Sequence, residues 1–144
     1  MPEAEVAEAA GYRSLLKRDW NIPQGADTVN GLRFGIETGG VITRPDLTQG
    51  WSARAQLRDV PGGTVWCTLT SDAATGPRIA LEAGGFFTLI IDAATTETDA
   101  WDEYAQIGQG AYDVELVSPD GQVIRHTEGT VFLYPDVTRT EDAS

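Results

Sequence analysis

Most of the chain alternates between apolar and polar positions with a period of two, which is the pattern of half-buried β-strands. The alternation begins near residue 28 and recurs in short stretches separated by turn residues. The apolar positions of these stretches are Leu32, Phe34 and Ile36; Trp51, Ala53, Ala55 and Leu57; Val65, Cys67 and Leu69; Ile79 and Leu81; Phe87, Leu89 and Ile91; and Tyr112, Val114 and Leu116. With a last stretch at 130–134, about seven strands predict a mainly β fold, an antiparallel sandwich or barrel. A mixed α+β fold with an N-terminal helix packed on one sheet stays open as the alternative.

Glycine and proline mark the turns between these strands. The clearest predicted hairpin covers residues 51–70, because two alternating runs flank Pro61-Gly62-Gly63. The glycine pairs at 39–40, 62–63 and 84–85 lack the spacing of a phosphate-binding loop, so they are predicted to be turns. Residues 92–104 interrupt the alternation, and the capping side chains at their start predict one or two helical turns.

Residues 1–18 carry a different pattern and are predicted to form an N-terminal helical arm. Helix formers fill residues 3–18, with Val6, Ala9, Ala10 and Leu16 at roughly helical spacing, and Pro23 ends the stretch. A helix of this length is marginal alone in water, so burial must hold it. We expect it to pack against another protein chain, with an interface of Val6, Tyr12, Leu15, Leu16 and Trp20. The sandwich domain is expected over 19–139, followed by a polar tail at 140–144 that frays.

The composition fits one soluble domain and excludes some classes of binding partner. The 144 residues include 10 basic and 22 acidic side chains, for a net charge of −12. Such an acidic surface repels phosphate backbones and anionic membranes, so we expect neither nucleic acid nor membrane as a partner. Residues 2–10 alternate acid and alanine, which does not resemble a signal peptide, and the longest apolar run, at 86–91, is too short to cross a bilayer.

The rare residues point away from catalysis and metal binding. A single cysteine, Cys67, and a single histidine, His126, provide neither an internal disulfide nor a zinc-ligand cluster. Any nucleophile–base arrangement would depend on His126, which lies in a predicted strand without a local catalytic signature. Asp99, Asp102 and Glu103 match no calcium loop and are better explained as a solvated acidic turn. We therefore expect no catalytic residue, no cofactor and no metal.

The four tryptophans are the remaining candidates for a binding site. Trp66 stands out because Val65, Cys67 and Leu69 occupy the opposite face of its predicted strand. An exposed tryptophan could stack on a sugar ring. Burial in the core, or cover by the arm or a neighbouring subunit, is favoured, so Trp66 joins the predicted interface.

Several stretches resemble, in the same order, the small tail-associated modules of tailed phages. The stretches are Asp19–Ala26, Ala53–Asp59 with Pro61-Gly62-Gly63, Ile90–Thr96, Ala111–Leu116, Ser118–Gly121, Gly129–Val131 and Pro135–Arg139. Such modules are similar to the N-terminal immunoglobulin-like domain of phage baseplate upper proteins. The resemblance covers residues 19–139. Trp101–Gly110 is longer than the usual connection, and no receptor-binding region follows residue 139, so a receptor role is not implied.

The resemblance implies an immunoglobulin-like antiparallel β-sandwich, here with the N-terminal helical arm. It implies a structural virion protein, a tail-tip, baseplate or adaptor component assembled in the host cytoplasm. Its partners would be other virion proteins, with several symmetry-related copies of the chain in the particle. Two alternatives stay open: a capsid decoration protein, and a carbohydrate-binding module for the host envelope. The family offers no catalytic residues to carry over.

Overall fold

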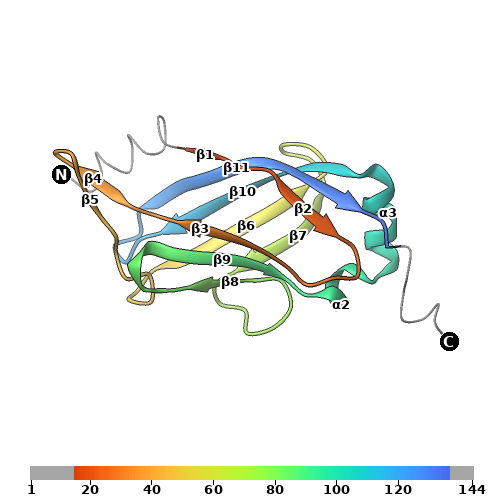
Figure 1. The fold of residues 1–144 in the computed structure, drawn as a ribbon, viewed down its shortest axis with the longest axis horizontal. Helices are drawn as coiled ribbons and strands as arrows, with labels where there is room; N and C mark the ends of the chain where they lie inside the picture. Colours follow the sequence, from red (N-terminus) through yellow and green to blue (C-terminus); the bar gives the residue numbers. More distant parts are fainter. Residues whose placement is uncertain (1–14, 137–144) are drawn as a thin grey trace.

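The computed structural model describes residues 15–136 and shows a mainly β protein (Figure 1). The strands are β1 (Leu16–Lys17), β2 (Trp20–Pro23), β3 (Thr28–Arg33), β4 (Ile36–Thr38), β5 (Val41–Thr43), β6 (Ser52–Arg58), β7 (Val65–Thr70), β8 (Arg78–Leu81), β9 (Phe86–Ile91), β10 (Gln109–Val117) and β11 (Val123–Tyr134). The helical elements are a 3₁₀ turn, η1 (Ala83–Gly85), and the helices α2 (Ala93–Thr96) and α3 (Asp99–Ile107). The predicted mainly β class is confirmed.

Nine of the strands form one sheet that curls back on itself. Its order is β1-β11-β10-β6-β7-β8-β9-β3, with β2 also paired to β11, and β4 and β5 form a separate hairpin. The bend lies between β7 and β8, which share a single parallel residue pair, Thr70 with Arg78. One layer therefore holds β2, β11, β10, β6 and β7, and the other holds β8, β9 and β3 (Figure 1).

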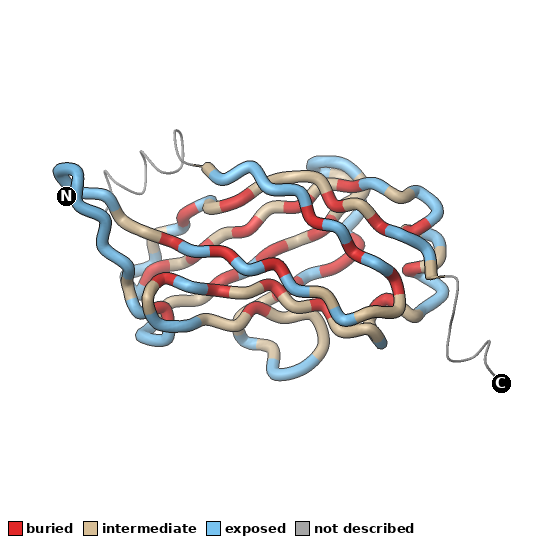
Figure 2. The backbone as a smooth tube through the Cα atoms, viewed as in Figure 1, coloured by how far each residue is buried: buried red, intermediate tan, exposed pale blue. Residues whose placement is uncertain are grey.

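The space between the two layers holds the core. Buried and more exposed positions alternate along the strands, as half-buried strands require (Figure 2). The largest fully buried side chains include Phe34, Phe87, Leu57 and Leu89. The predicted hairpin at 51–70 is confirmed as β6 paired antiparallel to β7. No helix in the described residues is long and apolar enough to cross a membrane.

Two β-bulges turn side chains away from the direction that simple alternation predicts. Leu57 pairs with Cys67 and Arg58 with Val65, so Trp66 is the extra residue of β7. Trp66 and Cys67 are consequently both buried, whereas Val65 is exposed. The prediction that Val65 shares the buried face and Trp66 points the other way is therefore wrong, and the bulge is its physical cause.

The second bulge lies in β11. Val114 pairs with Thr127 and Glu115 with Arg125, which leaves His126 as the extra residue. Its ring packs edge-on against Phe34 and Phe87 of the opposite layer. His126 is therefore a packed residue between the two layers.

The start of the described chain is a strand where the sequence predicts a helix. Leu16 and Lys17 form β1, parallel to β11, and the backbone N–H of Arg18 donates to the Glu128 carbonyl at 3.1 Å. The predicted arm over 1–18 is therefore wrong at its C-terminal end, because the open edge of β11 supplies backbone partners that an isolated helix cannot match. Val6 and Tyr12 lie outside the described residues, as do most of the arm and the tail at 140–144.

The predicted helical turns after residue 92 are confirmed, and they extend further than expected. Thr98 caps α3 by accepting a hydrogen bond from the Trp101 backbone N–H at 3.3 Å. Gly108 ends α3 with a left-handed backbone at φ 81°. The helix buries Trp101 and Ala105 against the end of the sandwich.

Candidate functional site

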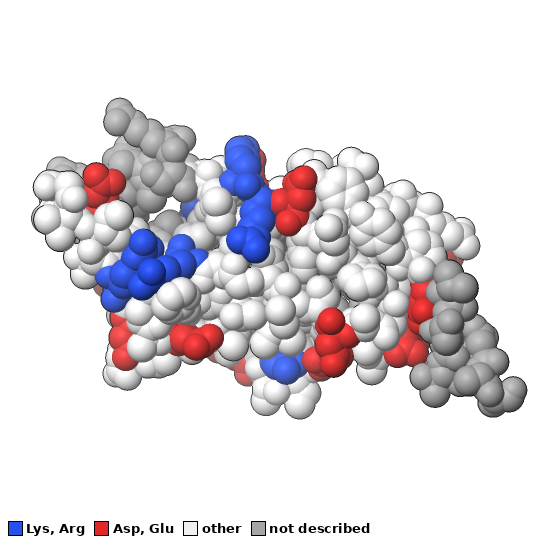
Figure 3. Space-filling view, viewed as in Figure 1, with Lys and Arg blue, Asp and Glu red and all other residues white. Residues whose placement is uncertain are grey.

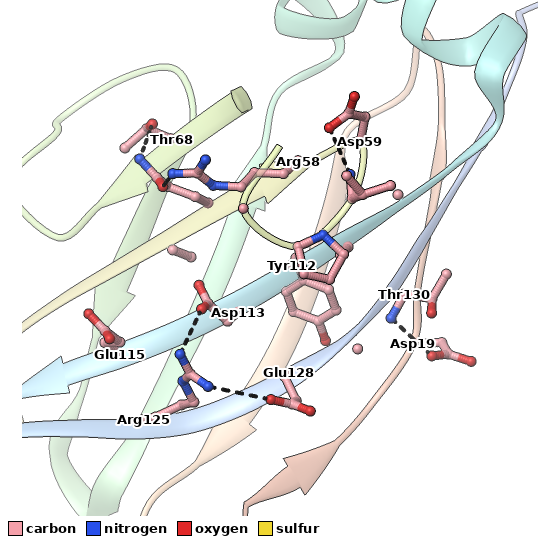
Figure 4. A pocket seen from close by; sticks show the side chains of 18 of the residues that line it. Asp19, Arg58, Asp59, Thr68, Tyr112, Asp113, Glu115, Arg125, Glu128 and Thr130 are labelled. Atoms are coloured by element: carbon pink, nitrogen blue, oxygen red, sulfur yellow. Dashed lines mark hydrogen bonds and ion pairs between the residues drawn. The ribbon is translucent and has the colours of Figure 1, made fainter. Parts of the chain in front are cut away.

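The outer side of one layer of the sandwich contains a hollow. A hollow of about 1190 Å³ lies over β6, β10 and β11, between the turn at 59–62 and the strand β1 (Figure 4). We call this surface the charged face and define it by its three strand rows and one flanking residue. Its members are Arg54, Gln56 and Arg58 on β6; Ala111, Asp113 and Glu115 on β10; Arg125, Glu128 and Thr130 on β11; and Lys17 on β1.

The charged face follows directly from strand alternation. On β6 and β10, alternate residues such as Ala55 and Val114 are buried in the core, so the residues between them point outward. The pairing register then sets outward residues of neighbouring strands side by side, Arg54 beside Glu115 and Gln56 beside Asp113. Basic and polar residues thus line β6, and acidic residues line the adjacent β10.

Ion pairs connect the rows of the charged face. Arg54 Nε donates to Glu115 Oε1 at 2.7 Å, across the β6–β10 pair. Arg125 on β11 lies 3.7 Å from Asp113 and 3.8 Å from Glu128 (Figure 4). Pairs of this kind on a surface contribute little stability singly, and more when they form a network.

The rim of the hollow is fixed by local hydrogen bonds. Arg58 Nη1 donates to the Gly63 carbonyl at 2.6 Å, and its Nη2 donates to Gln56 Oε1 at 2.7 Å. Asp59 Oδ1 accepts from the backbone N–H of Val60 at 2.7 Å and of Thr64 at 2.8 Å. These bonds fix the turn between β6 and β7 at the edge of the hollow.

Partial burial alters the acidity of one carboxyl on this face. The pKa of Asp113 is raised above its usual value, mainly because burial disfavours the charged form. Arg125 acts in the opposite direction and lowers it, while Glu115 adds to the increase.

Basic and acidic side chains occur together on the charged face. Lys17, Arg54, Arg58 and Arg125 line the hollow, and they are four of the eight lysine and arginine residues within 15–136. The side of the molecule that carries β3 and β9 shows several groups of basic and acidic side chains among uncharged ones (Figure 3). The charged face therefore carries both signs of charge in ordered rows, which suits recognition of another protein surface.

The predicted interface residues divide between core and surface. Trp20 is only 4% exposed and Trp66 only 7% exposed. Trp20 packs edge-on against Tyr112, and Trp66 stacks on Tyr104 of α3 at 5.2 Å between ring centres. Helix α3, rather than an arm or a neighbouring subunit, covers Trp66, so the expectation that these two rings anchor a partner chain is revised.

The remaining predicted residues are placed as far as the described chain allows. Leu15 is half-buried and Leu16 is 38% exposed at the edge of β11, whereas Val6 and Tyr12 lie outside the described part. The sequence prediction did not single out the charged face. The residues of the charged face are the polar positions of the alternating strands, and these are visible in the sequence. They indicate a common surface only once β6, β10 and β11 are known to be neighbours.

The two rare residues have environments set by burial. Burial raises the pKa of the Cys67 thiol to about 12, so this cysteine behaves as a small buried apolar residue, as predicted. Burial also lowers the pKa of His126, which favours its neutral form. Within residues 15–136, no group of three or more His, Cys, Asp or Glu side chains could hold a metal ion.

Comparison with known proteins gives only a weak structural similarity. No protein-family model matches the sequence, and no curated protein is similar to it in sequence. Among solved structures, the chain is similar to the crystal structure of the ZIG-8–RIG-5 IG1–IG1 heterodimer in its monoclinic form. The TM-score is 0.42 at 13% identity, over 92% of this chain and 98% of that chain. An identity this low leaves function open, since one fold serves many functions.

Proposed function

We propose that this chain is a structural protein of a tailed phage, a tail-tip, baseplate or adaptor component that acts through protein–protein contacts. We expect the charged face to form these contacts, because its rows of basic and acidic side chains can recognise a protein surface without any catalytic group. The ordered sequence stretches that resemble tail-associated modules support the place in the particle.

The proposed fold within the mainly β class is an immunoglobulin-like sandwich. Its support is the strand order, in which β6, β10 and β11 form one layer with β7 at the side, and β8, β9 and β3 form the other. Variable-type immunoglobulin sandwiches likewise extend the layer of their C, F and G strands, in their case by the two strands C′ and C″. With Cys67 as the only cysteine, the chain lacks the disulfide that joins the layers in antibody domains.

Three of the resembling stretches meet at one end of the sandwich, which gives them a shared structural purpose. Gln24 Nε2 donates to the Thr96 carbonyl at 2.8 Å, and the Gly25 N–H donates to Thr96 Oγ1 at 2.8 Å. The Asp136 N–H donates to Gln24 Oε1 at 3.2 Å. These contacts join the start of the domain, the segment before α3 and the residues just after β11 into one packed cluster.

The alternative of a carbohydrate-binding module loses its main support. It depended on an exposed tryptophan such as Trp66, and that ring is covered by Tyr104. The alternative of a capsid decoration protein uses the same kind of protein contacts and differs in location, so the test of the proposal must separate tail from head.

The proposal is tested by locating the chain in particles. Phage particles produced by the strain that encodes the chain are purified, and separated tails and heads are compared by quantitative mass spectrometry. We expect the chain in the tail fraction, in a fixed ratio to the tail-tube protein, and gold-labelled antibody at the tail tip in electron micrographs. Its recovery only with heads would favour the decoration protein, and its absence from particles would refute a virion role.

A further inference from the structure

The charged face carries two neighbouring rows whose charges are complementary to each other. The β6 row holds Arg54 and Gln56, and the β10 row holds Glu115 and Asp113 at the same heights along the strands. A partner that fits both rows must present acidic groups over β6 and basic or amide groups over β10, with the spacing of a β-sheet. The chain itself presents that arrangement.

A twofold axis brings the two rows of one copy onto those of another. Consider two such faces packed together, with the axis between them running along the strands, midway between β6 and β10. The rotation exchanges the rows and keeps the height along the strand, so β6 of each copy lies over β10 of the other. Since Arg54 and Glu115 are register partners, Arg54 of each copy then lies over Glu115 of the other, and Gln56 lies over Asp113.

We propose that two copies of this chain pair through their charged faces, with reciprocal contacts between Arg54 of one copy and Glu115 of the other. This inference rests on the proposed role in protein contacts and names the first partner as a second copy. Such an isologous contact is closed, because each face is used once by both copies. The pair would form the symmetric unit that then docks on other virion proteins.

The balance of charges makes the contact favourable but sensitive to conditions. Within one copy, Arg54 and Glu115 already form an ion pair at 2.7 Å. Pairing places the Arg54–Glu115 pair of the second copy over it, with arginine over glutamate and glutamate over arginine. Each charge then gains a further opposite neighbour, and in exchange it loses the hydration of its exposed side. Packed sheets cross at about −30°, so the match is best near the crossing point. The Gln56–Asp113 pair lies only one outward position from Arg54–Glu115 on the two strands, which keeps both within the matched region.

The experiment measures self-association of the purified full-length chain and two charge reversals, by sedimentation equilibrium up to about 0.5 mM, where a Kd near 1 mM is still detectable. The wild type is expected to form dimers that weaken as salt is raised from about 0.05 M to about 0.5 M. Arg54→Glu places like charges together twice in each dimer, and Glu115→Arg does the same with opposite sign. Each should weaken self-association by at least about 100-fold.

Mixing the two variants is the decisive measurement. In a mixed pair, Glu at position 54 of one chain faces Arg at position 115 of the other, and the native Arg54 faces the native Glu115. We expect the mixture to form a one-to-one heterodimer of near wild-type affinity, although neither variant pairs with itself. Arg33→Glu, the same charge change on β3 of the other layer, should leave the wild-type dimer unchanged.

Other results would overturn the pairing. These are a wild type that remains monomeric to about 0.5 mM, a dimer unaffected by both reversals, or a mixture of folded variants that stays monomeric. If circular dichroism shows that a reversal fails to fold, Arg54→Gln and Glu115→Gln replace the pair, and each should weaken the dimer by about tenfold. A dimer with no place in phage tails would refute the proposed function alone, and a monomer found in tails would refute the pairing alone.

Discussion

The imidazole of His126 is tied to the backbone of Arg33 across the two layers of the sandwich. Its Nε2 lies 2.9 Å from the Arg33 carbonyl oxygen. Because a carbonyl oxygen only accepts, Nε2 carries the proton, and Nδ1 is left to accept from the Thr127 hydroxyl. The bulge in β11 is what aims the ring inward, so the contact depends on one extra residue in the strand.

The first prediction is that His126 makes the fold less stable in mild acid. Burial lowers its folded-state pKa below the ordinary value of 6.5. As pH falls through about 6.5, the His126 imidazole is protonated in the unfolded chain but stays neutral in the folded chain. The free energy of unfolding therefore decreases. We expect the melting temperature to fall between about pH 7.5 and about pH 5.5, above the usual titration range of carboxyl groups.

A His126→Gln variant supplies the control for this pH dependence. It removes the titrating group, so its melting temperature should change less over the same interval, whatever its value at neutral pH. Differential scanning calorimetry of both chains measures the two slopes. Equal slopes would show that another group causes the acid sensitivity.

The second prediction concerns Gly110, an inward position of β10. A Cβ there would lie well under 3.0 Å from the Arg58 carbonyl oxygen and the Trp66 ring. Gly110→Ala should therefore destabilise the fold by about 1–3 kcal/mol through overpacking, measured by urea unfolding. Gly31→Ala is the matched control, since a Cβ on this strand glycine has nothing within 4 Å. A loss for Gly31→Ala as large as for Gly110→Ala would contradict the steric explanation.

Local alternation predicted the longer strands of the two layers well because one face of each lies on the core. The hairpin of β6 and β7 and the strands β8 and β9 follow the pattern directly. Alternation failed at Trp66 and His126, where a bulge adds one residue. A bulge depends on which residues of the partner strand lie opposite, and the local pattern does not contain that information.

Long-range pairing also explains the other differences. Helix formers before residue 18 predicted an arm, yet Leu16 and Lys17 pair with β11, more than 100 residues further along the chain. The charged face depends in the same way on β6 lying beside β10, although about 50 residues separate them. Its polar residues are visible in the sequence, but their common surface is a property of the sheet order.

The third prediction tests the cluster that joins three of the resembling stretches. Gln24 is a buried polar residue whose side chain bonds the Thr96 carbonyl and Asp102 Oδ1 and accepts from the Asp136 N–H. Gln24→Ala removes these bonds and leaves a buried carbonyl without its partner, so we expect a loss of about 1–3 kcal/mol in urea unfolding. Gln109→Ala, at an exposed position, should change stability by less than about 0.5 kcal/mol. Equal stability of the Gln24→Ala chain and the wild type would show that the cluster does not hold this end together.

The last prediction separates the first strand from the residues before it. Deleting residues 1–14 removes none of the contacts described for the sandwich. Deleting residues 1–18 also removes β1, the Arg18 N–H bond to Glu128, and the Arg18 carbonyl that accepts from the Tyr112 hydroxyl. The Tyr112 hydroxyl then keeps only its bond from Asn30 Nδ2 at 3.2 Å. Each hydrogen bond lost in this way costs about 0.5–1.5 kcal/mol. We therefore expect the shorter deletion to leave the melting temperature within about 2 °C of the wild type, and the longer one to lower it by at least about 4 °C. Equal melting temperatures for the two deletions would show that β1 contributes nothing to the fold.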